Sequence, residues 1–294
     1  MKTKPVILIV DDVAVNVQIL VNLLKDEYEL KVAIDGKRAL EFAQVEPIPD
    51  LILLDITMPK MDGYEVLSHL KETDITSKIP VIFVTGNTSI EDEEKGLNQG
   101  AVDYITKPIS PAIVKARVKT HIMLKLQRDE LLYNATHDQL TGLNNRHVLS
   151  EEGQRKFSRA LRQKDKLSAV ILDIDHFKQV NDKYGHLMGD KILINLANVL
   201  SHEMRTEDFI ARFGGEEFIV ILENCDAKDA ENIAQKFRKS IEESEVEGVK
   251  VTASFGVCEL SSKHKTFESL LKDADIALYR AKDNGRNRVE VFMD

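Results

Sequence analysis

Short apolar runs alternate with amphipathic stretches over the first third of the chain. The apolar runs have the length of buried strands, and apolar residues three or four positions apart in the segments between them predict helices. Strands that alternate with helices form a parallel sheet covered on both faces. We therefore expect a doubly wound, five-stranded parallel α/β domain over residues 1–110. Its expected strands are residues 6–10, 30–33, 51–54, 81–84 and 102–105, and its expected helices are residues 16–25, 37–43, 64–70 and 91–99.

Residues 111–136 predict one long linker helix, because helix formers dominate and no glycine or proline follows Pro111 in this segment. Two partial stripes recur at three- or four-residue steps. One contains Val114, His121, Leu124, Arg128, Leu131 and Ala135, and the other contains Val118, Ile122 and Leu132. The stripes are short and partly polar, which fits a weak coiled coil with more than one register. A single helix packed against its own preceding domain is the alternative.

Residues 137–294 mix helical patterns with antiparallel strand patterns, which predicts an α+β domain. The expected helices are residues 147–164, two helices that end near residue 204, and residues 227–243 and 266–284. The expected strands are residues 168–174, a hairpin over residues 209–222, and residues 249–257 and 288–292.

The hairpin has Gly214, Gly215, Glu216 and Glu217 at its tip, between two apolar runs. Glycine permits backbone angles and a close ligand approach that side chains forbid. Two adjacent carboxylates ionise together at low cost only when a cation or solvent shares the site. Four such residues also occur in ordinary exposed turns, so the phosphate and metal chemistry that they indicate depends on the rest of the chain.

Composition bounds the class of protein. The chain has 294 residues, 30% charged and 43% hydrophobic, which is typical of a globular protein, and no apolar run reaches the roughly 20 residues of a membrane helix. A net charge of −9 argues against a nucleic-acid partner. Cys225 and Cys258 lack metal-ligand spacing and are interpreted as reduced thiols. We expect a cytoplasmic protein without a membrane partner.

Polar residues follow the strands of the first domain. Asp11 and Asp12 come after the first strand, Asp55 after the third, Thr85 after the fourth and Lys107 after the fifth. In open parallel sheets, ligands bind at the carboxyl ends of the strands. Three acids, a hydroxyl and a lysine at one sheet edge suit a divalent cation and an aspartate that accepts a phosphoryl group.

This arrangement resembles the receiver domain of two-component response regulators, a flavodoxin-like fold, with I-L-I-V-D-D, L-L-D-I-T-M-P and K-P all present. The resemblance implies that Asp55 is phosphorylated by a histidine kinase. It also implies a Mg²⁺ ion held by Asp12, Asp55 and the Thr57 carbonyl, with help from Asp11. Three switch residues follow from the same resemblance: Thr85 and Lys107 contact the phosphoryl oxygens, and Tyr104 changes rotamer with Thr85.

The second domain resembles the GGDEF diguanylate cyclases, whose fold is similar to nucleotide cyclase and polymerase palm domains. The motifs are D-x-L-T-G-L-x-N-R at 138–146, D-x-D-x-F-K-x-x-N-D at 173–182, G-D at 189–190 and GGEEF at 214–218. Asn144 stands where family members usually have proline. The two resemblances together cover nearly the whole chain.

This second resemblance implies the residue roles of the cyclase. Magnesium or manganese is bound by Asp173, the Ile174 carbonyl, Glu216 and Glu217, and Glu216 helps to deprotonate the 3′-hydroxyl of GTP. The triphosphate is bound by Phe177, Lys178, Gly214, Gly215, Lys282 and Arg286. Guanine is bound by Asn181 and Asp190. A carboxylate accepts the adjacent N1–H and N2–H donors of guanine, which adenine lacks, so GTP is favoured over ATP.

One site holds one GTP, whereas cyclic di-GMP joins two, so the resemblance implies a homodimer formed through the receiver domain and the linker helix. Phosphorylation of Asp55 would control that pairing. Arg205 and Asp208 match the R-x-x-D product-inhibition motif in residue type and spacing. Such a spacing is more often a surface ion pair, but the placement of Arg205 nine residues before Gly214 favours the motif. One alternative is a catalytically silent receptor for cyclic di-GMP or GTP, which the presence of Asp173, Glu216 and Glu217 disfavours. Another is a cyclase that makes a different cyclic dinucleotide, which Asp190 disfavours.

Overall fold

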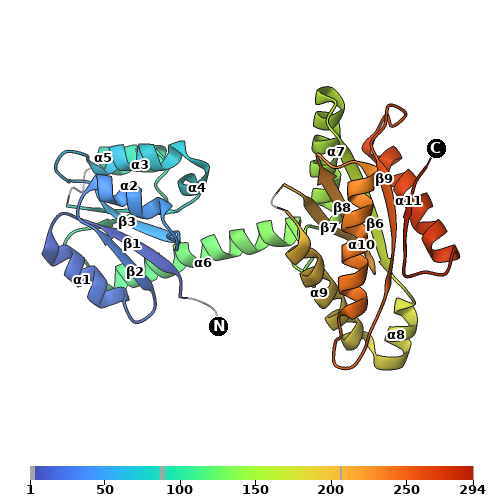
Figure 1. Ribbon diagram of the computed structural model, residues 1–294. Helices are drawn as coiled ribbons and strands as arrows, with labels where there is room; N and C mark the ends of the chain where they lie inside the picture. Colours follow the sequence, from blue (N-terminus) through green and yellow to red (C-terminus); the bar gives the residue numbers. More distant parts are fainter. Residues whose placement is uncertain (1–3, 87–89, 206, 294) are drawn as a thin grey trace. The chain divides into compact units, whose positions relative to one another are not determined.

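The computed structural model describes residues 4–86, 90–205 and 207–293, with the side chains of residues 90–93 excepted. The chain divides into two compact units, Met1–Leu131 and Leu132–Asp294 (Figure 1). The domain division predicted from the sequence, at residues 110 and 136, remains a prediction. No helix in the described ranges is long and apolar enough to cross a membrane.

The first unit is the expected doubly wound α/β domain. Its five strands are all parallel, in the order β2-β1-β3-β4-β5, and helices lie between them along the chain. The strands are β1 (Val6–Val10), β2 (Glu29–Ala33), β3 (Leu51–Asp55), β4 (Val81–Thr85) and β5 (Asp103–Thr106), and the helices are α1 (Ala14–Leu24), α2 (Gly36–Gln44), α3 (Gly63–Glu72), α4 (Asp74–Ser77) and α5 (Ile90–Asn98). Only α4 was not predicted, because a single turn is too short to show a helical period.

Helix α6 (Pro111–Thr136) is continuous, and its N-terminal half packs against the first unit. Val114, Val118 and Ile122 are buried in the apolar cluster that covers one face of the sheet. Arg117 and His121 both pair with Asp103 at the start of β5. This half of the helix is thus packed on the sheet of the first unit. The coiled coil stays a prediction, for which the later residues Leu124 and Leu131, 53% and 70% exposed, are available.

The second unit is the expected α+β domain. Its sheet has the order β10-β9-β6-β8-β7, and every neighbouring pair is antiparallel except β9 with β10. The strands are β6 (Leu167–Ile174), β7 (Phe209–Gly214), β8 (Glu217–Glu223), β9 (Ala253–Glu259) and β10 (Val289–Val291). The helices are α7 (Arg146–Gln163), α8 (Phe177–Tyr184), α9 (His186–Glu203), α10 (Ala227–Glu243) and α11 (Phe267–Asp283).

The strand predicted at residues 249–257 was wrong at its start. Val249 exchanges two backbone hydrogen bonds with Val246 around a tight turn at Gly248, whose φ is +83°, so it does not join the sheet. The strand runs instead from Ala253 to Glu259, and Glu259 pairs with Ser168. The apolar residues of the 249–252 segment contribute to the core without strand pairing.

Alternate residues of β6 face opposite layers, as the two-residue period of a strand requires. Val170, Leu172 and Ile174 pack in one cluster with residues of α9 and α10, whereas Ala169 and Ile171 pack with residues of α7 and α11 (Figure 1). Asp173 is the next-to-last residue of the strand, and Asp175 follows the strand directly. The sheet therefore carries carboxylates to one edge, next to the β7–β8 hairpin.

Candidate functional site

The first acidic site lies at the carboxyl ends of β1, β3 and β5. Carboxylate oxygens of Asp11, Asp12 and Asp55 lie within 4.8 Å of one another, and Asp11 and Asp55 are buried. The Lys107 ammonium bridges two of these acids, 2.9 Å from Asp11 Oδ2 and 2.8 Å from Asp55 Oδ2. The fold thus brings together four residues from three segments that lie far apart in the sequence.

Asp55 has a perturbed environment. Burial raises its pKa most and the neighbouring Asp11 raises it further, while the hydrogen bond from Lys107 opposes the rise. The backbone N–H of Thr57 donates to Asp55 Oδ1 at 3.3 Å. Thr85 is buried at the end of β4, and the backbone N–H of Lys107 donates to its carbonyl at 2.7 Å. Tyr104 lies on β5, with its ring 5.4 Å from the Arg117 guanidinium.

The second acidic site lies where β6 ends beside the hairpin. Asp173 is 7% exposed, and its Cα is paired with that of Glu217 across the antiparallel ladder. The Lys282 ammonium on α11 lies 2.9 Å from Asp173 Oδ1. Burial raises the pKa of Asp173 to about 6, Lys282 opposes this rise, and the charges of Glu216 and Glu217 add to it. The cation that this acidic cluster holds is the Lys282 ammonium group.

The hairpin tip is fixed by a brace that the sequence patterns did not predict. Arg212 donates to the Gly215 carbonyl from Nε at 3.0 Å and from Nη2 at 2.7 Å. Its Nη1 also donates to Asp138 Oδ1 at 2.9 Å. Asn144, which stands in the usual proline position, donates from its side chain to the Ile210 carbonyl at 2.9 Å. The D-x-L-T motif is therefore a support for the glycine turn.

The side chain of Asn181 has a buried oxygen that accepts no hydrogen bond from the described residues. Its Oδ1 is the one buried side-chain polar atom within the described ranges that makes no hydrogen bond. Gly189 on α9 faces it so closely that a Cβ there would lie 2.0 Å from Asn181 Oδ1. Asp190, the next residue, is half-buried in the same region of α9. A buried acceptor without a donor is costly, so this oxygen suits a ligand that brings an N–H group.

Four of the six predicted triphosphate residues lie at or just beyond the ends of two helices. Phe177 is buried and Lys178 is exposed in the first turn of α8, where backbone N–H groups have no helical partner. Lys282 is in the last turn of α11, and Arg286 follows that helix with a φ of +62°. Ile174 ends β6 and is paired with Ala253.

Arg205 and Asp208 follow helix α9, which ends at Glu203, and precede β7. The Asp208 carboxylate accepts the Arg205 backbone N–H at 3.2 Å, and the Arg205 side chain is exposed. Thr206 is outside the described residues. The structure thus places an exposed arginine close to Asp208.

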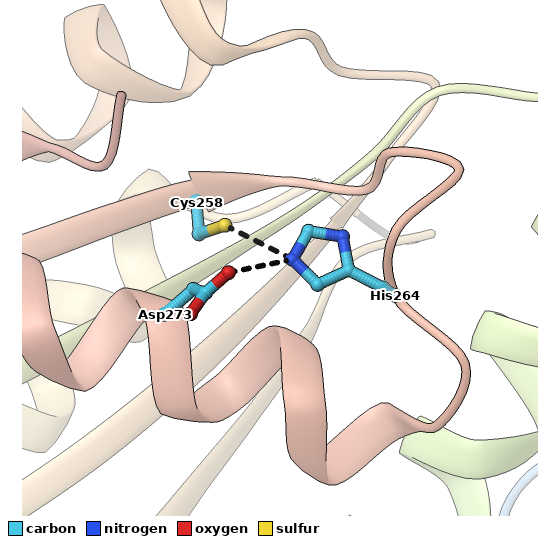
Figure 2. Close-up of side chains that lie close together, drawn as sticks. All are labelled: Cys258, His264 and Asp273. Atoms are coloured by element: carbon cyan, nitrogen blue, oxygen red, sulfur yellow. Dashed lines mark hydrogen bonds and ion pairs between the residues drawn. The ribbon is translucent and has the colours of Figure 1, made fainter. Parts of the chain in front are cut away.

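A separate cluster of Cys258, His264 and Asp273 lies between β9 and α11 (Figure 2). His264 Nδ1 accepts the backbone N–H of Ser261 at 2.9 Å, and Nε2 faces Asp273 Oδ2 at 3.1 Å. An Nδ1 that accepts a hydrogen bond carries no proton, so the neutral ring is protonated at Nε2 and donates to Asp273. Because a donating Nε2 is not a metal ligand, the cluster is a buried hydrogen-bond network that anchors the loop before α11.

The comparison with protein families finds a match for each part of the chain. Residues 135–288, more than half of the chain, match the family model described as diguanylate cyclase, GGDEF domain. The chain belongs to the GGDEF family. In this GGDEF protein, residues 7–119 match the response regulator receiver domain, so the predicted order of a receiver followed by a GGDEF domain is confirmed.

Known proteins are similar to all or part of this chain. The GGDEF protein is 34% identical over 296 residues to the response regulator PleD of Caulobacter vibrioides, covering 96% of the chain and 65% of PleD. It therefore spans slightly less than two thirds of that relative. It is 40% identical over 175 residues to the diguanylate cyclase DgcP of Pseudomonas aeruginosa, covering 58% of the chain and 25% of DgcP. A crystal structure of the coiled coil and GGDEF domain of DgcB from Caulobacter crescentus, in complex with c-di-GMP, matches with a TM-score of 0.55 and 29% identity, covering 61% of this chain and 96% of that one.

Proposed function

We propose that this GGDEF protein is a phosphorylation-regulated diguanylate cyclase, which condenses two GTP molecules to cyclic di-GMP and releases two diphosphates. The single observation that carries the proposal is the acidic cluster at the end of β6, where Asp173 lies near Glu216 and Glu217 and holds the Lys282 ammonium at 2.9 Å. The match to the diguanylate cyclase family and the similarity to PleD support it.

A divalent cation, Mg²⁺ or Mn²⁺, is expected at this cluster. The residues fit such an ion, because carboxylate oxygens are its preferred ligands and the cluster already attracts a positive group. Asp173, Glu216, Glu217 and the Ile174 carbonyl would hold it. When bound, the ion neutralises phosphate charge and lowers the pKa of the attacking hydroxyl. Lys282 would then be released from Asp173.

Each of the two condensation steps forms a bond between the 3′-oxygen of one GTP and the α-phosphorus of the other. The bond from that phosphorus to the oxygen that bridges to the β-phosphate breaks, and diphosphate leaves with the electron pair. Glu216 is our candidate to accept the hydroxyl proton. Lys282 and Arg286 would stabilise the leaving diphosphate by charge-assisted hydrogen bonds, with Lys178 and the backbone amide of Phe177. The glycines of the hairpin tip, 214 and 215, would allow the phosphates to approach the backbone.

Guanine selection follows from donors and acceptors. Asp190 would accept N1–H and one hydrogen of the exocyclic amine, and the unpartnered Asn181 Oδ1 would accept the other. Adenine has no such pair of donors, so ATP would leave both acceptors unpaired. The expected specificity for GTP therefore depends on an oxygen that has no partner within the described part of the protein.

The receiver is proposed to control the pairing of two chains. A histidine kinase would phosphorylate Asp55, with Mg²⁺ held by Asp11, Asp12, Asp55 and the Thr57 carbonyl. Two of these acids, Asp11 and Asp55, already bind the Lys107 ammonium. Thr85 and Lys107 would then contact the phosphoryl oxygens, and Tyr104 would follow Thr85. The change would reach α6, through which the homodimer would bring two GTP sites face to face.

Product inhibition is proposed at the turn after α9. Arg205 is exposed, and the turn is held by the hydrogen bond between its backbone N–H and the Asp208 carboxylate. An exposed guanidinium recognises phosphate and stacks on nucleobases, so cyclic di-GMP would bind here. Arg205→Ala should weaken inhibition by added product while leaving the initial rate unchanged.

The test is conversion of GTP by the purified full chain with Mg²⁺, with products separated by chromatography. We expect cyclic di-GMP and diphosphate from the unmodified protein, and at least a hundredfold loss for Asp173→Asn. Asp283→Asn is the matched control, because it removes one exposed carboxylate from the end of α11. Equal rates for Asp173→Asn and the unmodified protein would contradict the assignment of the metal site.

A catalytically silent receptor is the second candidate function. It would bind cyclic di-GMP at the Arg205 turn without consuming GTP. The three acids of the cluster favour the cyclase, because a receptor needs no cation beside the α-phosphate. Tight binding of cyclic di-GMP together with no diphosphate release from GTP would favour the receptor.

A further inference from the structure

Asp175 is a buried carboxylate for which the proposed chemistry has no use. It is 5% exposed and lies two residues beyond Asp173. Its Oδ1 accepts the Ser254 hydroxyl at 2.6 Å, and its Oδ2 accepts the Thr252 hydroxyl at 2.7 Å and the backbone N–H of Asn287 at 3.0 Å. These three donors are neutral, so the charge is held by oriented hydrogen bonds and not by an ion pair. One of them comes from a segment 112 residues away.

That segment has an unusual backbone. Three consecutive residues have positive φ angles: +111° at Gly285, +62° at Arg286 and +47° at Asn287. Glycine adopts such angles freely, whereas arginine and asparagine adopt them against steric resistance and rarely in succession. A conformation of this kind persists only when its surroundings determine it. The backbone bond to Asp175 falls on the last of the three residues.

Other contacts hold the two sides of this segment. The Arg286 N–H donates to the Ala281 carbonyl at 3.0 Å, which closes the end of α11, and the Arg288 carbonyl accepts the Phe255 N–H at 2.9 Å. The Asn287 side chain bonds to Glu242 and Arg238 on α10. The Arg286 side chain itself is exposed and makes no bond to any residue in the described ranges. The backbone conformation therefore sets the point from which this side chain extends, and no side-chain contact in the described ranges does so.

We propose that Asp175 is a positioning residue for Arg286, an inference that rests on the proposed function. By accepting the Asn287 N–H, the carboxylate fixes the left-handed pair of residues 286 and 287 and so directs the Arg286 guanidinium to the β- and γ-phosphates of GTP. The end of β6 thus has two tasks. Asp173 serves the metal, and Asp175 supports the phosphate-binding arginine.

Two substitutions of Asp175 separate the effect of losing its hydrogen bonds from the effect of losing its charge. In Asp175→Asn, the amide oxygen can still accept from Thr252 and Asn287, while its NH₂ donates to the Ser254 hydroxyl, which can also accept. We expect its KM for GTP to stay within about twofold of the unmodified value. In Asp175→Ala, the Asn287 N–H loses its acceptor, and we expect KM to rise about tenfold. Asp283→Asn serves as the control for loss of a nearby charge.

Two measurements on the full chain with Mg²⁺ are decisive. One asks whether the loss of nucleotide affinity requires the β- and γ-phosphates, and the other asks whether the effects of Asp175→Ala and Arg286→Ala add. GMP lacks the phosphates that Arg286 would contact, so calorimetry should give unchanged GMP affinity for Asp175→Ala and about tenfold weaker affinity for a nonhydrolysable GTP analogue. In an Arg286→Ala background, adding Asp175→Ala should change neither affinity. A further tenfold loss in that background, or an equal loss of GMP affinity, would overturn the proposal.

A milder variant keeps the test valid if Asp175→Ala does not fold. Thr252→Val removes one of the two donors to Oδ2 at a partly exposed position. We expect a GTP KM about threefold higher with unchanged GMP affinity. Unchanged affinity for the GTP analogue would overturn the proposal. Failure of the proposed function would be visible separately, as absence of cyclic di-GMP from the unmodified protein.

Discussion

Replacing Gly189 with alanine should weaken guanine recognition with little effect on folding. The new Cβ would lie 2.0 Å from Asn181 Oδ1 and 3.1 Å from Phe177 Cζ. The first contact is with the end of a flexible side chain, so Asn181 rotates away at low cost. Its Oδ1 has no hydrogen bond within the described residues to lose. We therefore expect the free energy of unfolding to change by less than about 1 kcal/mol, since alanine also favours the helix.

The magnitude for the ligand follows from the hydrogen bond that is lost. If Asn181 Oδ1 accepts the exocyclic amine of guanine, its displacement leaves a buried N–H unpaired, which costs about 1–3 kcal/mol. That corresponds to a 5- to 150-fold lower kcat/KM for GTP, at about 1.4 kcal/mol per factor of ten. Inosine triphosphate lacks this amine, so its kcat/KM should not change. The preference for GTP over inosine triphosphate should therefore fall by the same factor.

The assay is diphosphate release from each nucleotide by the full chain with Mg²⁺. Leu187→Ala is the matched control, because Leu187 lies in the first turn of the same helix and is 80% exposed. It should leave both rates unchanged. A Gly189→Ala protein with the unmodified preference for GTP over inosine triphosphate would refute the role given to Asn181.

Three further predictions concern the structure of the second domain. Arg212→Ala should lower kcat by about tenfold or more, because it removes the two hydrogen bonds to the Gly215 carbonyl that hold the hairpin tip. An unchanged kcat would show that catalysis does not depend on these bonds. Gly256→Ala should destabilise the second domain by about 3 kcal/mol in thermal unfolding, because its Cβ would lie 2.1 Å from the Ala274 carbonyl oxygen, which is backbone of α11; an unchanged melting temperature would contradict the packing. Burial raises the pKa of the Cys258 thiol from 9.0 to about 12, so its thiolate fraction at pH 8 should be about a thousandfold lower than in the unfolded chain. Rapid alkylation of the native protein at this position would be inconsistent with that burial.

Local patterns were sufficient to predict the strands and most helices. The continuous apolar runs of β1, β3 and β4 predicted the sheet, and the acidic residues at the ends of β1 and β3 predicted its functional edge. The short helix α4 and the start of β9 were missed for different reasons. A four-residue turn shows no period, and the tight turn at Gly248 takes Val249 out of the strand.

Contacts between distant residues could not be predicted in this way. Arg212 and Asp138 are 74 residues apart, and Asp175 and Asn287 are 112 apart. Each motif suggested chemistry for its own residues, but no spacing indicated that Asp138 supports the hairpin or that Asp175 supports the residues after α11. The close approach of Gly189 to Asn181 likewise depends on how α8 and α9 pack.

The central claim is that phosphorylation of the receiver controls cyclic di-GMP synthesis. The most direct measurement is the rate of cyclic di-GMP formation from GTP by the full chain with Mg²⁺, before and after treatment with beryllium fluoride, a phosphoryl mimic, together with the oligomeric state. We predict a rise in rate with a shift toward dimer, and no response in Asp55→Asn. An equal rate with and without beryllium fluoride would contradict the regulatory coupling, and no cyclic di-GMP in either condition would contradict the cyclase itself.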